Sequence, residues 1–507
     1  MKNADNILDQ NAGSEITLDQ IQDFKGKYPK QLWFLFLAEM WERFSFYGMR
    51  GMLVLFMADK TLGLGISEKD ANLQYGATQA FVYTFAFIGG MFADKILGFR
   101  KSIFWGGLLM IVGSFVLAVA PKELFYIGIS FTIIGTGFFK PNISSMVGSL
   151  YKADDPRRDA GFSLFYSGIN VGALFGGAAC IAVAHTYGWN LAFGLSGIFM
   201  TFGLLVFSFT QRTLGPIGLS PIIGKLDETK SKYARYAVYI GSLLAIPLIL
   251  ILVSNSKFTD IFMYIVGPLA LIYILIEMLK YSAIERKKII AALVFIIFSV
   301  FFWAFFEQSG GSLSLFAKNN LNADFLGVNL DPNVVNNSSN SLFVIIFSPL
   351  IGLLFIWMYK RKIEPNSIIK FGIAFLLLSL SFYVFYLLRF YAVDGKSSLV
   401  VFTLAYLIIT FAELFLSPIG LSLMTKLSPK NLNGAMMGLW FLASAYGQYA
   451  AGILGAGMAT ADETAPSHEK LISYTDGYHQ LAIYAVISGV ALIVISPLVK
   501  KLMQGVK

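Results

Sequence analysis

Charged residues interrupt an apolar run near the start of the chain, between Trp33 and Met57. On a helix, residues three or four positions apart are neighbours, so the charges and two aromatic residues fall near one face. This stripe consists of Glu39, Glu42, Arg43, Phe46, Tyr47 and Arg50. Each charge in hydrocarbon costs roughly 2.5–3.5 kcal/mol on insertion scales. The stripe must therefore face water or opposite charge inside a bundle, where it can carry protons or bind a charged ligand. A static ion-pair network that only fixes helix packing is the alternative.

Three further ionisable residues lie inside later apolar runs. Lys140 precedes Pro141, which can kink its helix, and the carboxylates are Glu307 and Glu413. We expect the Lys140 ammonium to find a carboxylate, with Glu39 or Glu42 as the partner. The four acids Glu39, Glu42, Glu307 and Glu413 give −4, whereas Arg43, Arg50 and Lys140 give +3. The excess negative charge leaves room for one proton or for the ammonium of a ligand.

Composition indicates an integral membrane protein. The chain has 507 residues, of which 56% are hydrophobic and 14% charged, whereas soluble domains carry about 25% charged residues. The net charge of +9 does not predict nucleic-acid binding, because the basic residues gather in loops between apolar runs. Cys180 is the single cysteine, so no intrachain disulfide forms. The first thirty residues lack the apolar core of a signal peptide and are read as a cytoplasmic tail.

Apolar runs of about twenty residues predict fourteen membrane spans. Their approximate ranges are 31–58, 75–97, 101–120, 123–149, 160–184, 189–210, 233–254, 258–281, 288–317, 340–360, 367–391, 396–425, 431–459 and 478–503. The basic clusters, for example Lys95–Lys101, Arg286–Lys288 and Lys360–Lys362, fall in even-numbered gaps or at the ends. The positive-inside rule therefore predicts that both termini are cytoplasmic.

The fourteen spans divide as six, two and six. The polar segment 211–231, which contains Pro and Gly, follows the sixth span, and the next two spans carry no buried acid–base set. We expect a cytoplasmic tail over 1–30, a six-helix bundle over 31–210, a linker with two extra helices over 211–287, and a second six-helix bundle with a short tail over 288–507.

Several motifs occur in a consistent order. They are the E-x-x-E-R-F stretch Glu39–Tyr47, the loop Gly89–Lys101, the segment Gly135–Ser145, the segment Phe165–Gly172 and the segment Ala412–Ser422. Together they resemble the proton-dependent oligopeptide transporters, a branch of the major facilitator superfamily. The resemblance covers nearly the whole chain and implies an all-α major facilitator fold. Phe46 stands where the first of two tyrosines is usual, which removes one expected hydroxyl contact.

The resemblance implies roles for individual residues. Proton coupling would involve Glu39, Glu42, Arg43, Lys140, Glu307 and Arg50. Substrate binding would involve Arg43, Tyr47, Tyr83, Lys140, Asn170, Trp303, Asn340, Glu413, Trp440 and Ser444. A cytoplasmic gating loop would involve Asp94 and Arg100. Arg43 and Lys140 suit a peptide carboxylate, since the planar guanidinium gives two parallel hydrogen bonds, and Glu413 suits the peptide amino group.

These expectations define a symporter that imports di- and tripeptides with protons by alternating access of the two bundles. It is not an enzyme, needs no cofactor beyond the coupling proton, and works as a monomer in the plasma or inner membrane. The chain lacks a Walker A motif, so direct ATP coupling is not expected. Three alternatives stay open: a proton-coupled transporter of nitrate, a drug or another small solute, a nutrient receptor or channel on the same scaffold, and, least favoured, an intramembrane hydrolase.

Overall fold

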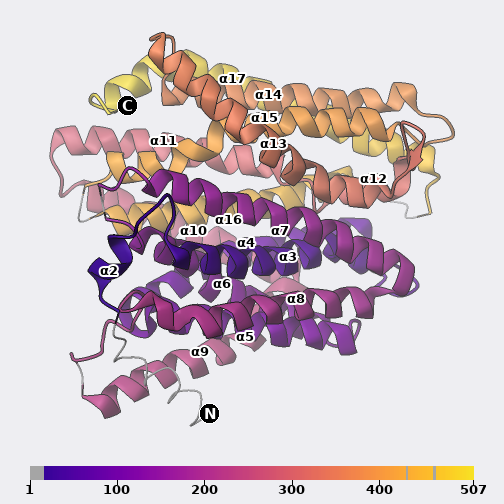
Figure 1. Cartoon of the computed structure of the whole chain (residues 1–507). Coiled ribbons are helices and arrows are strands. Elements are labelled where there is room, and N and C mark those ends of the chain that lie inside the picture. Colours follow the sequence, from indigo (N-terminus) through magenta and orange to yellow (C-terminus); the bar gives the residue numbers. More distant parts are fainter. Residues whose placement is uncertain (1–15, 153, 226, 430–431, 461–463, 507) are drawn as a thin grey trace. The chain divides into compact units, whose positions relative to one another are not determined.

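The computed structural model describes residues 16–152, 154–225, 227–429, 432–460 and 464–506. The predicted cytoplasmic tail lies partly outside these residues. The described chain is almost entirely helical (Figure 1). A two-stranded antiparallel ribbon, β1 (Asp324–Phe325) and β2 (Val328–Asn329), follows the short helix α12 (Ser312–Asn320).

In the described residues, fourteen long helices correspond to the fourteen predicted spans. They are α3 (Lys30–Ala58), α4 (Glu68–Phe92), α5 (Gly98–Val119), α6 (Phe125–Ser149), α7 (Arg158–Tyr187), α8 (Trp189–Thr210), α9 (Glu228–Ser254), α10 (Ser256–Met278), α11 (Ala283–Phe306), α13 (Pro332–Lys360), α14 (Ser367–Leu387), α15 (Leu399–Leu427), α16 (Asn433–Met458) and α17 (Ser467–Leu502). In the part of the chain that the structure describes, 10 helical segments are long and apolar enough to cross a membrane, and one of them joins α4 to α5. The charged helix α3 is not among these segments.

Local sequence explains several helix ends. Ser282 and Glu285 form a capping box at the start of α11, in which each side chain bonds the other residue's backbone N–H. Asp331 caps α13, whose first residue is Pro332. The expected ninth span, 288–317, differs in the structure because α11 ends at Phe306 and α12 begins at Ser312. The expected last span, 478–503, starts earlier, at Ser467.

The segment between α4 and α5 is a π-helical turn, η2 (Ala93–Leu97), and not an irregular loop. Gly98 follows it with φ 75°, a left-handed conformation that favours glycine. A Cβ at Gly98 would lie 2.5 Å from the backbone of Leu219. Glycine is therefore required at Gly98 by both conformation and space.

The chain divides into two compact units. Unit 1 comprises Met1–Arg50 and Phe81–Ser254. Within it α5 packs along α6 and α8, and α9 packs on α6. Trp105 Nε1 donates to Ser242 Oγ at 3.0 Å and ties α5 to α9. A short helix, α2 (Leu18–Gln22), and the 3-10 turn η3 (Gln211–Leu214) complete this unit.

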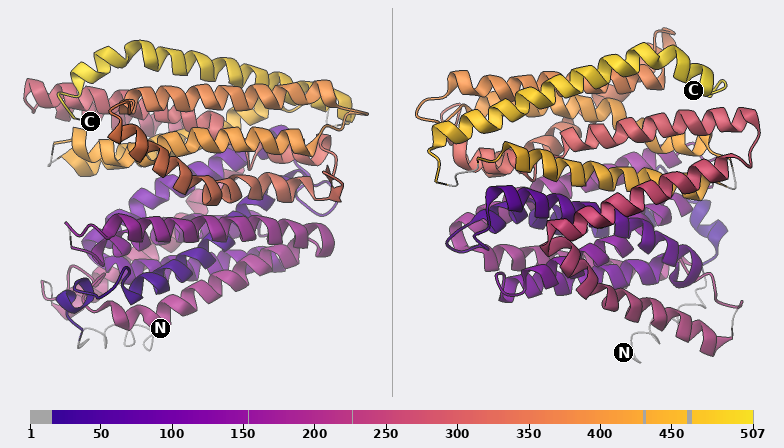
Figure 2. Two further views of the ribbon diagram at one scale, coloured as in Figure 1. Left: turned by 45° about the horizontal axis from the view of Figure 1, so that its top comes forward. Right: turned by 180° about the vertical axis from the view of Figure 1, so that it is seen from behind.

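Unit 2 comprises Gly51–Ala80 and Asn255–Lys507. Within it α14 packs along α17 and α15, and α11 packs along α16, as Figure 2 shows for the orange and yellow helices. The 3-10 turn η4 (Leu388–Tyr391) extends α14. The boundaries of these two units differ from those of the expected bundles, 31–210 and 288–507. The boundaries of the bundles stay a prediction.

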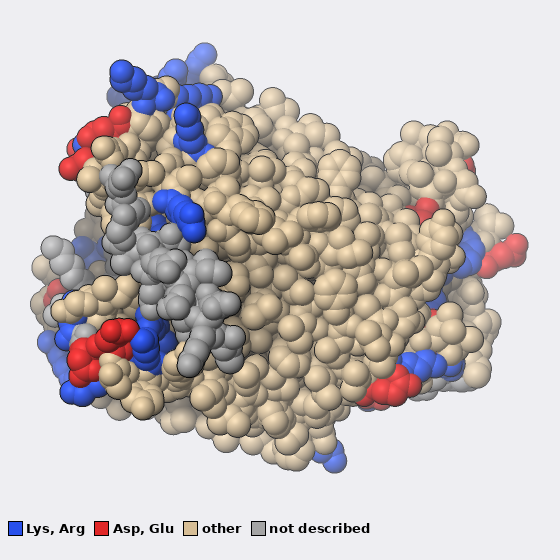
Figure 3. Space-filling model, turned by 60° about the horizontal axis from the view of Figure 1, so that its bottom comes forward, with Lys and Arg blue, Asp and Glu red and all other residues tan. Residues whose placement is uncertain are grey.

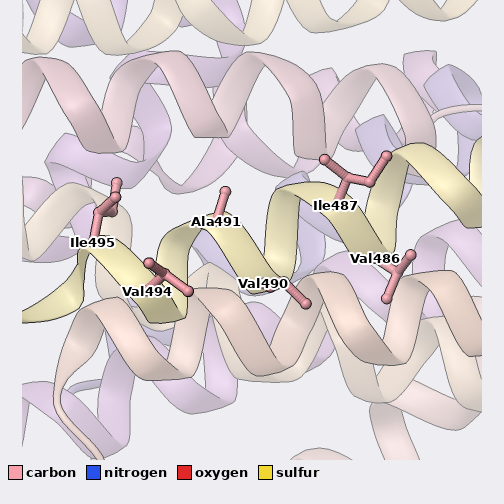
Figure 4. Close-up of a pocket in the computed structure, with 6 residues that line it drawn as sticks. All are labelled: Val486, Ile487, Val490, Ala491, Val494 and Ile495. Atoms are coloured by element: carbon pink, nitrogen blue, oxygen red, sulfur yellow. The ribbon is translucent and has the colours of Figure 1, made fainter.

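The exposed surface is suited to lipid. Figure 3 shows Lys, Arg, Asp and Glu gathered in clusters on the visible face, which also has broad areas without charge. On α17 the exposed residues include Ile487, Val490 and Val494, at 60%, 50% and 70%. Figure 4 shows these side chains lining a shallow apolar groove on this helix. The groove carries no polar side chain and is no candidate for a peptide site.

Candidate functional site

Three charged residues of α3 form a buried cluster in unit 1. Arg43 Nε donates to Glu39 Oε1 at 2.8 Å and lies 2.6 Å from Glu42 Oε2. The contact between Arg43 and Glu42 is short enough for an ion pair but does not have the geometry of a hydrogen bond. Both Glu42 oxygens are therefore without a hydrogen-bond partner. Glu39 Oε2 and Arg43 Nη2 are also without one. The side chains of all three residues are at most 2% exposed.

This cluster has capacity for a ligand and for a proton. Buried polar groups are nearly always hydrogen-bonded, and an unsatisfied charged group is especially costly. A guanidinium with an unused N–H suits a carboxylate, and a carboxylate without donors suits a proton. The Arg43 N–H and the carboxylate oxygens that no protein group bonds are the atoms through which a ligand or a proton would act.

Lys140 differs from the expected geometry. Within the described residues it forms no ion pair with Glu39 or Glu42, and its Nζ lies 4.2 Å from the centre of the Tyr83 ring. Both Tyr83 and Lys140 were expected to contact substrate, and the structure brings them together. Cation–π attraction to the Tyr83 ring holds the Lys140 ammonium. From there the ammonium is able to donate hydrogen bonds to a carboxylate.

The two cations of the α3 stripe, Arg43 and Arg50, also lie over aromatic rings. Arg43 lies 5.5 Å from the centre of the Phe46 ring, and Arg50 lies 5.6 Å from that of Tyr47. Phe46 therefore keeps a cation contact even though it lacks the hydroxyl of the usual tyrosine. The glycines of α7 allow α3 to approach closely: a Cβ at Gly172 would lie 2.9 Å from Arg43 Cβ.

Asn170 on α7 is buried, and its Nδ2 donates to Tyr166 O of the same helix at 3.0 Å. The amide does not join two helices through this bond. The expected role of Asn170 in reading a peptide bond stays a prediction.

A second polar cluster lies in unit 2. Asn340 Nδ2 on α13 donates to Glu413 Oε2 on α15 at 2.9 Å and approaches Thr410 Oγ1 at 3.2 Å. Tyr406, one turn earlier on α15, hydrogen-bonds Asn336. Sequence reasoning named Asn340 and Glu413 but missed Thr410 and Tyr406. The spacing of Tyr406, Thr410 and Glu413 along one apolar helix was the signal that would have found them.

The remaining expected residues of unit 2 lie on α11 and α16. Glu307 follows α11 as its C-cap residue and is 5% exposed, and its N–H donates to Trp303 O at 3.0 Å. Trp303 Nε1 is buried and has no hydrogen-bond partner. On α16, Ser444 Oγ bonds its own helix at Trp440 O, at 3.4 Å. Arg50 belongs to unit 1 and Glu307 to unit 2, so their expected pairing stays a prediction.

The two expected gating residues, Arg100 and Asp94, differ in their surroundings. Arg100 is buried and donates to the carbonyls of Ile217, at 2.7 Å, and Gly215. Asp94 is exposed on the π-helical turn. Arg100 therefore fastens α5 to the segment after η3, a role that sequence reasoning missed. In the motif at Ala412–Ser422, the side chains of 417–419 and 421–422 lie outside the described residues.

Comparison with known proteins decides the family. The model of the POT family matches residues 100–471. The chain is 34% identical over 456 residues to the peptide transporter YePEPT of Yersinia enterocolitica, which covers 86% of this chain and 89% of that protein. This chain belongs to the POT family. It is therefore a membrane transporter of the major facilitator type and not an enzyme.

Two further POT proteins extend the comparison. The dipeptide and tripeptide permease B of Photorhabdus luminescens is 28% identical over 94% of this chain and 97% of its own length. The crystal structure of a peptide transporter POT in complex with sulfate matches with a TM-score of 0.81 and 33% identity, over 97% of this chain and all of that one. No group of three or more His, Cys, Asp or Glu in the described residues is arranged to hold a metal ion.

Proposed function

We propose that this chain imports di- and tripeptides together with protons by alternating access. The observation that carries the proposal is the α3 cluster, in which a buried arginine lies between two carboxylates whose hydrogen bonds are not all made. Relatives of the POT family named peptide transporter or dipeptide and tripeptide permease support the substrate class.

The peptide carboxylate binds Arg43 Nη2 and the ammonium of Lys140. Arg43 offers the planar donor that a carboxylate needs, and Lys140 is held over the Tyr83 ring without a carboxylate partner in the described residues. The peptide amino group binds Glu413, which Asn340 orients through one oxygen. Tyr47, Asn170 and Asn340 hydrogen-bond the peptide backbone, and Trp303, Trp440 and Ser444 line the side-chain pockets.

Protons bind Glu42 and Glu39 and later Glu307. Glu42 is the first candidate because it is fully buried and both of its oxygens lack hydrogen-bond donors. Protonating Glu307 releases Arg50. A proton falling through ~100 mV supplies ~2.3 kcal/mol per charge, and one pH unit adds ~1.4 kcal/mol. Together they support roughly 400-fold accumulation of a neutral peptide.

The protein works as a monomer in the plasma or inner membrane with both termini in the cytoplasm. The orientation follows from the basic clusters in even-numbered gaps. The mass of the purified protein in nanodiscs tests the monomer, and reagent access to cysteines placed at Lys60 and Lys230 tests the orientation. Lys230 should be reached only from the cytoplasmic side.

Uptake into proteoliposomes tests the function. Labelled dialanine should accumulate when the external pH is acidic and the interior negative, and a protonophore should abolish the accumulation. Competition by excess unlabelled dipeptides, but not by nitrate, separates peptide from other solutes. Binding without counterflow would instead identify a receptor, and accumulation unaffected by the protonophore would contradict proton coupling.

A further inference from the structure

The end of α3 and the start of α4 form a helical hairpin that belongs to unit 2. This hairpin, Gly51–Ala80, is grouped with Asn255–Lys507, whereas the rest of both helices is grouped with unit 1. Sequence reasoning placed the hairpin in the bundle 31–210. In the orientation proposed above, the hairpin lies on the outer side of the membrane.

The hairpin packs on α16 through backbone. A Cβ at Gly76 of α4 would lie 2.7 Å from Gly452 Cα, and one at Gly452 would lie 2.8 Å from Gly76 Cα. A Cβ at Gly455 would lie 2.6 Å from Asn72 Oδ1. These glycines let the backbones of α4 and α16 approach closely, and polar contacts at the start of α4 add to this packing.

Glu68, the first residue of α4, receives three donors from other parts of unit 2. Its Oε1 accepts from Lys470 Nζ at 2.8 Å and from Asn319 Nδ2 at 2.9 Å. Its Oε2 accepts from Tyr474 OH at 2.6 Å. Lys470 and Tyr474 lie one turn apart on α17, and Asn319 lies at the end of α12.

The surroundings of Glu68 suit a contact that forms and breaks. The side chains of Glu68 and Lys470 are 16% and 13% exposed. They are buried enough to escape most screening by solvent. They are also near enough to water to be hydrated when α4 moves away from α17, so opening leaves no charge stranded in hydrocarbon.

We propose that Glu68 is the latch of an outer gate, which holds the hairpin Gly51–Ala80 to α17 when the outer side is closed. The latch forms with Lys470, Tyr474 and Asn319 and breaks when the transporter opens outward. This inference rests on the proposed function for the direction of opening. It concerns charges distinct from Arg43 and its neighbours on α3.

Spin labels on the hairpin and on unit 2 measure the latch directly. Leu62 and Val328 are 59% and 58% exposed, and each is changed to Cys in a Cys180→Ala background, which removes the single native cysteine. Pulsed electron resonance in nanodiscs then gives the distance distribution. Glu68→Gln should raise the ratio of long to short distances about tenfold, since it weakens charged hydrogen bonds.

Glu469→Gln is the matched control. Glu469 neighbours Lys470 but is exposed, so the same loss of charge should leave the distances unchanged. Lys470→Gln removes one of the three donors to Glu68 and should shift the distances in the same direction as Glu68→Gln. The double variant should open no further than Glu68→Gln alone, because Lys470 acts on the latch through Glu68.

The outcomes separate the latch from the proposed function. Wild-type distances in Lys470→Gln contradict the latch, even if Glu68→Gln fails to fold. An equal shift in Glu469→Gln contradicts it as well, because general surface charge would then be the cause. The distance measurement needs no substrate, so lost peptide uptake with the expected shifts would count against the peptide assignment alone.

Discussion

At the scale of single residues, hydrogen-bond satisfaction distinguishes the two acids of α3. Glu39 accepts a hydrogen bond from Arg43 Nε, whereas Glu42 is within ion-pair distance but accepts none. The sequence placed both acids on one face without ranking them, because side-chain geometry does not follow from helical spacing. In the proposed mechanism we therefore assign proton binding first to Glu42 and the orientation of Arg43 to Glu39.

Glu42→Gln should retain peptide counterflow and lose uptake driven by a pH gradient. The amide mimics a protonated acid, so the carrier exchanges peptide but cannot release its proton and return empty. Counterflow and gradient-driven uptake are measured in the same proteoliposomes. Glu39→Gln is the comparison and should lower both activities, since it loosens Arg43. Accumulation at the wild-type level in Glu42→Gln would show that Glu42 takes no part in proton coupling. Loss of both activities with a lower melting temperature would instead show that Glu42 serves helix packing.

Arg43→Ala should abolish gradient-driven uptake in a protein that remains inserted in the membrane. The substitution removes the peptide carboxylate's planar donor and the counter-charge of two buried acids. Arg43→Lys keeps the charge but not the paired donors, so we expect uptake to fall at least about tenfold. Initial uptake rates, normalised to inserted protein, provide the measurement. A wild-type rate in Arg43→Ala would refute the carboxylate assignment.

Glu413→Gln should weaken binding of free-amine peptides far more than binding of N-acetylated peptides. The reason is that the acid supplies the partner of the ammonium, which acetylation already removes. Competition against labelled dialanine measures both affinities. Thr410→Val is the control, because it removes a hydroxyl near Asn340 without changing charge. Equal losses for both ligands would assign Glu413 to structure or proton coupling.

At the scale of elements, each helix of the extra pair is fastened to a different unit. On α9, Ser242 accepts from Trp105 in unit 1. On α10, the N–H of Gly267 donates to Tyr446 OH of α16 at 2.7 Å, and that hydroxyl bonds Met263 O. The contact lies beside Pro268, which cannot donate a backbone hydrogen bond. The expected linker hairpin is thus anchored at both helices.

Tyr446→Phe should lower stability, because Gly267 N–H and Met263 O lose their shared partner near the proline. We expect a loss of about 1–3 kcal/mol, read as a lower melting temperature in detergent. Tyr273→Phe on α10 is the control, since Tyr273 is 53% exposed. An equal change in both variants would show that the hydroxyl of Tyr446 contributes nothing specific.

A second element is the connection between α6 and α7. Its local stability should depend on pH only in strongly acidic solution. Arg157 beside Asp155 lowers the pKa of that carboxyl, and Arg157 also donates to Phe24 O at 3.0 Å and to Gly26 O at 3.1 Å. A depressed folded pKa gives stability above the ordinary value, about 3.9, which is lost as the pH falls through the lower folded pKa. Hydrogen exchange at residues 22–28 should be constant from about pH 5 to 8 after correction for intrinsic rates. Asp155→Asn should raise it across this range.

At the scale of the whole molecule, the sequence predicts the helices better than their grouping. Apolar runs locate the fourteen long helices of the described residues, since membrane thickness fixes their length. They do not reveal that α3 and α4 are each divided between two units near Arg50 and Ala80. That division depends on long-range contacts such as Gly76 with Gly452 and Glu68 with Lys470. The ring contact of Lys140 was missed for the same reason.

The division of α3 and α4 has a consequence for the order of synthesis. Chains are made from the N-terminus, and domains generally fold as units in that order. The hairpin Gly51–Ala80 leaves the ribosome long before α16 and α17, which supply its partners. Until those helices are made, the polar face with Glu68 and Asn72 lacks its partners. It must be covered by the insertion machinery, by lipid or by a chaperone. A nascent chain halted after residue 254 would still expose the hairpin, and this intermediate is where quality-control proteases would act first.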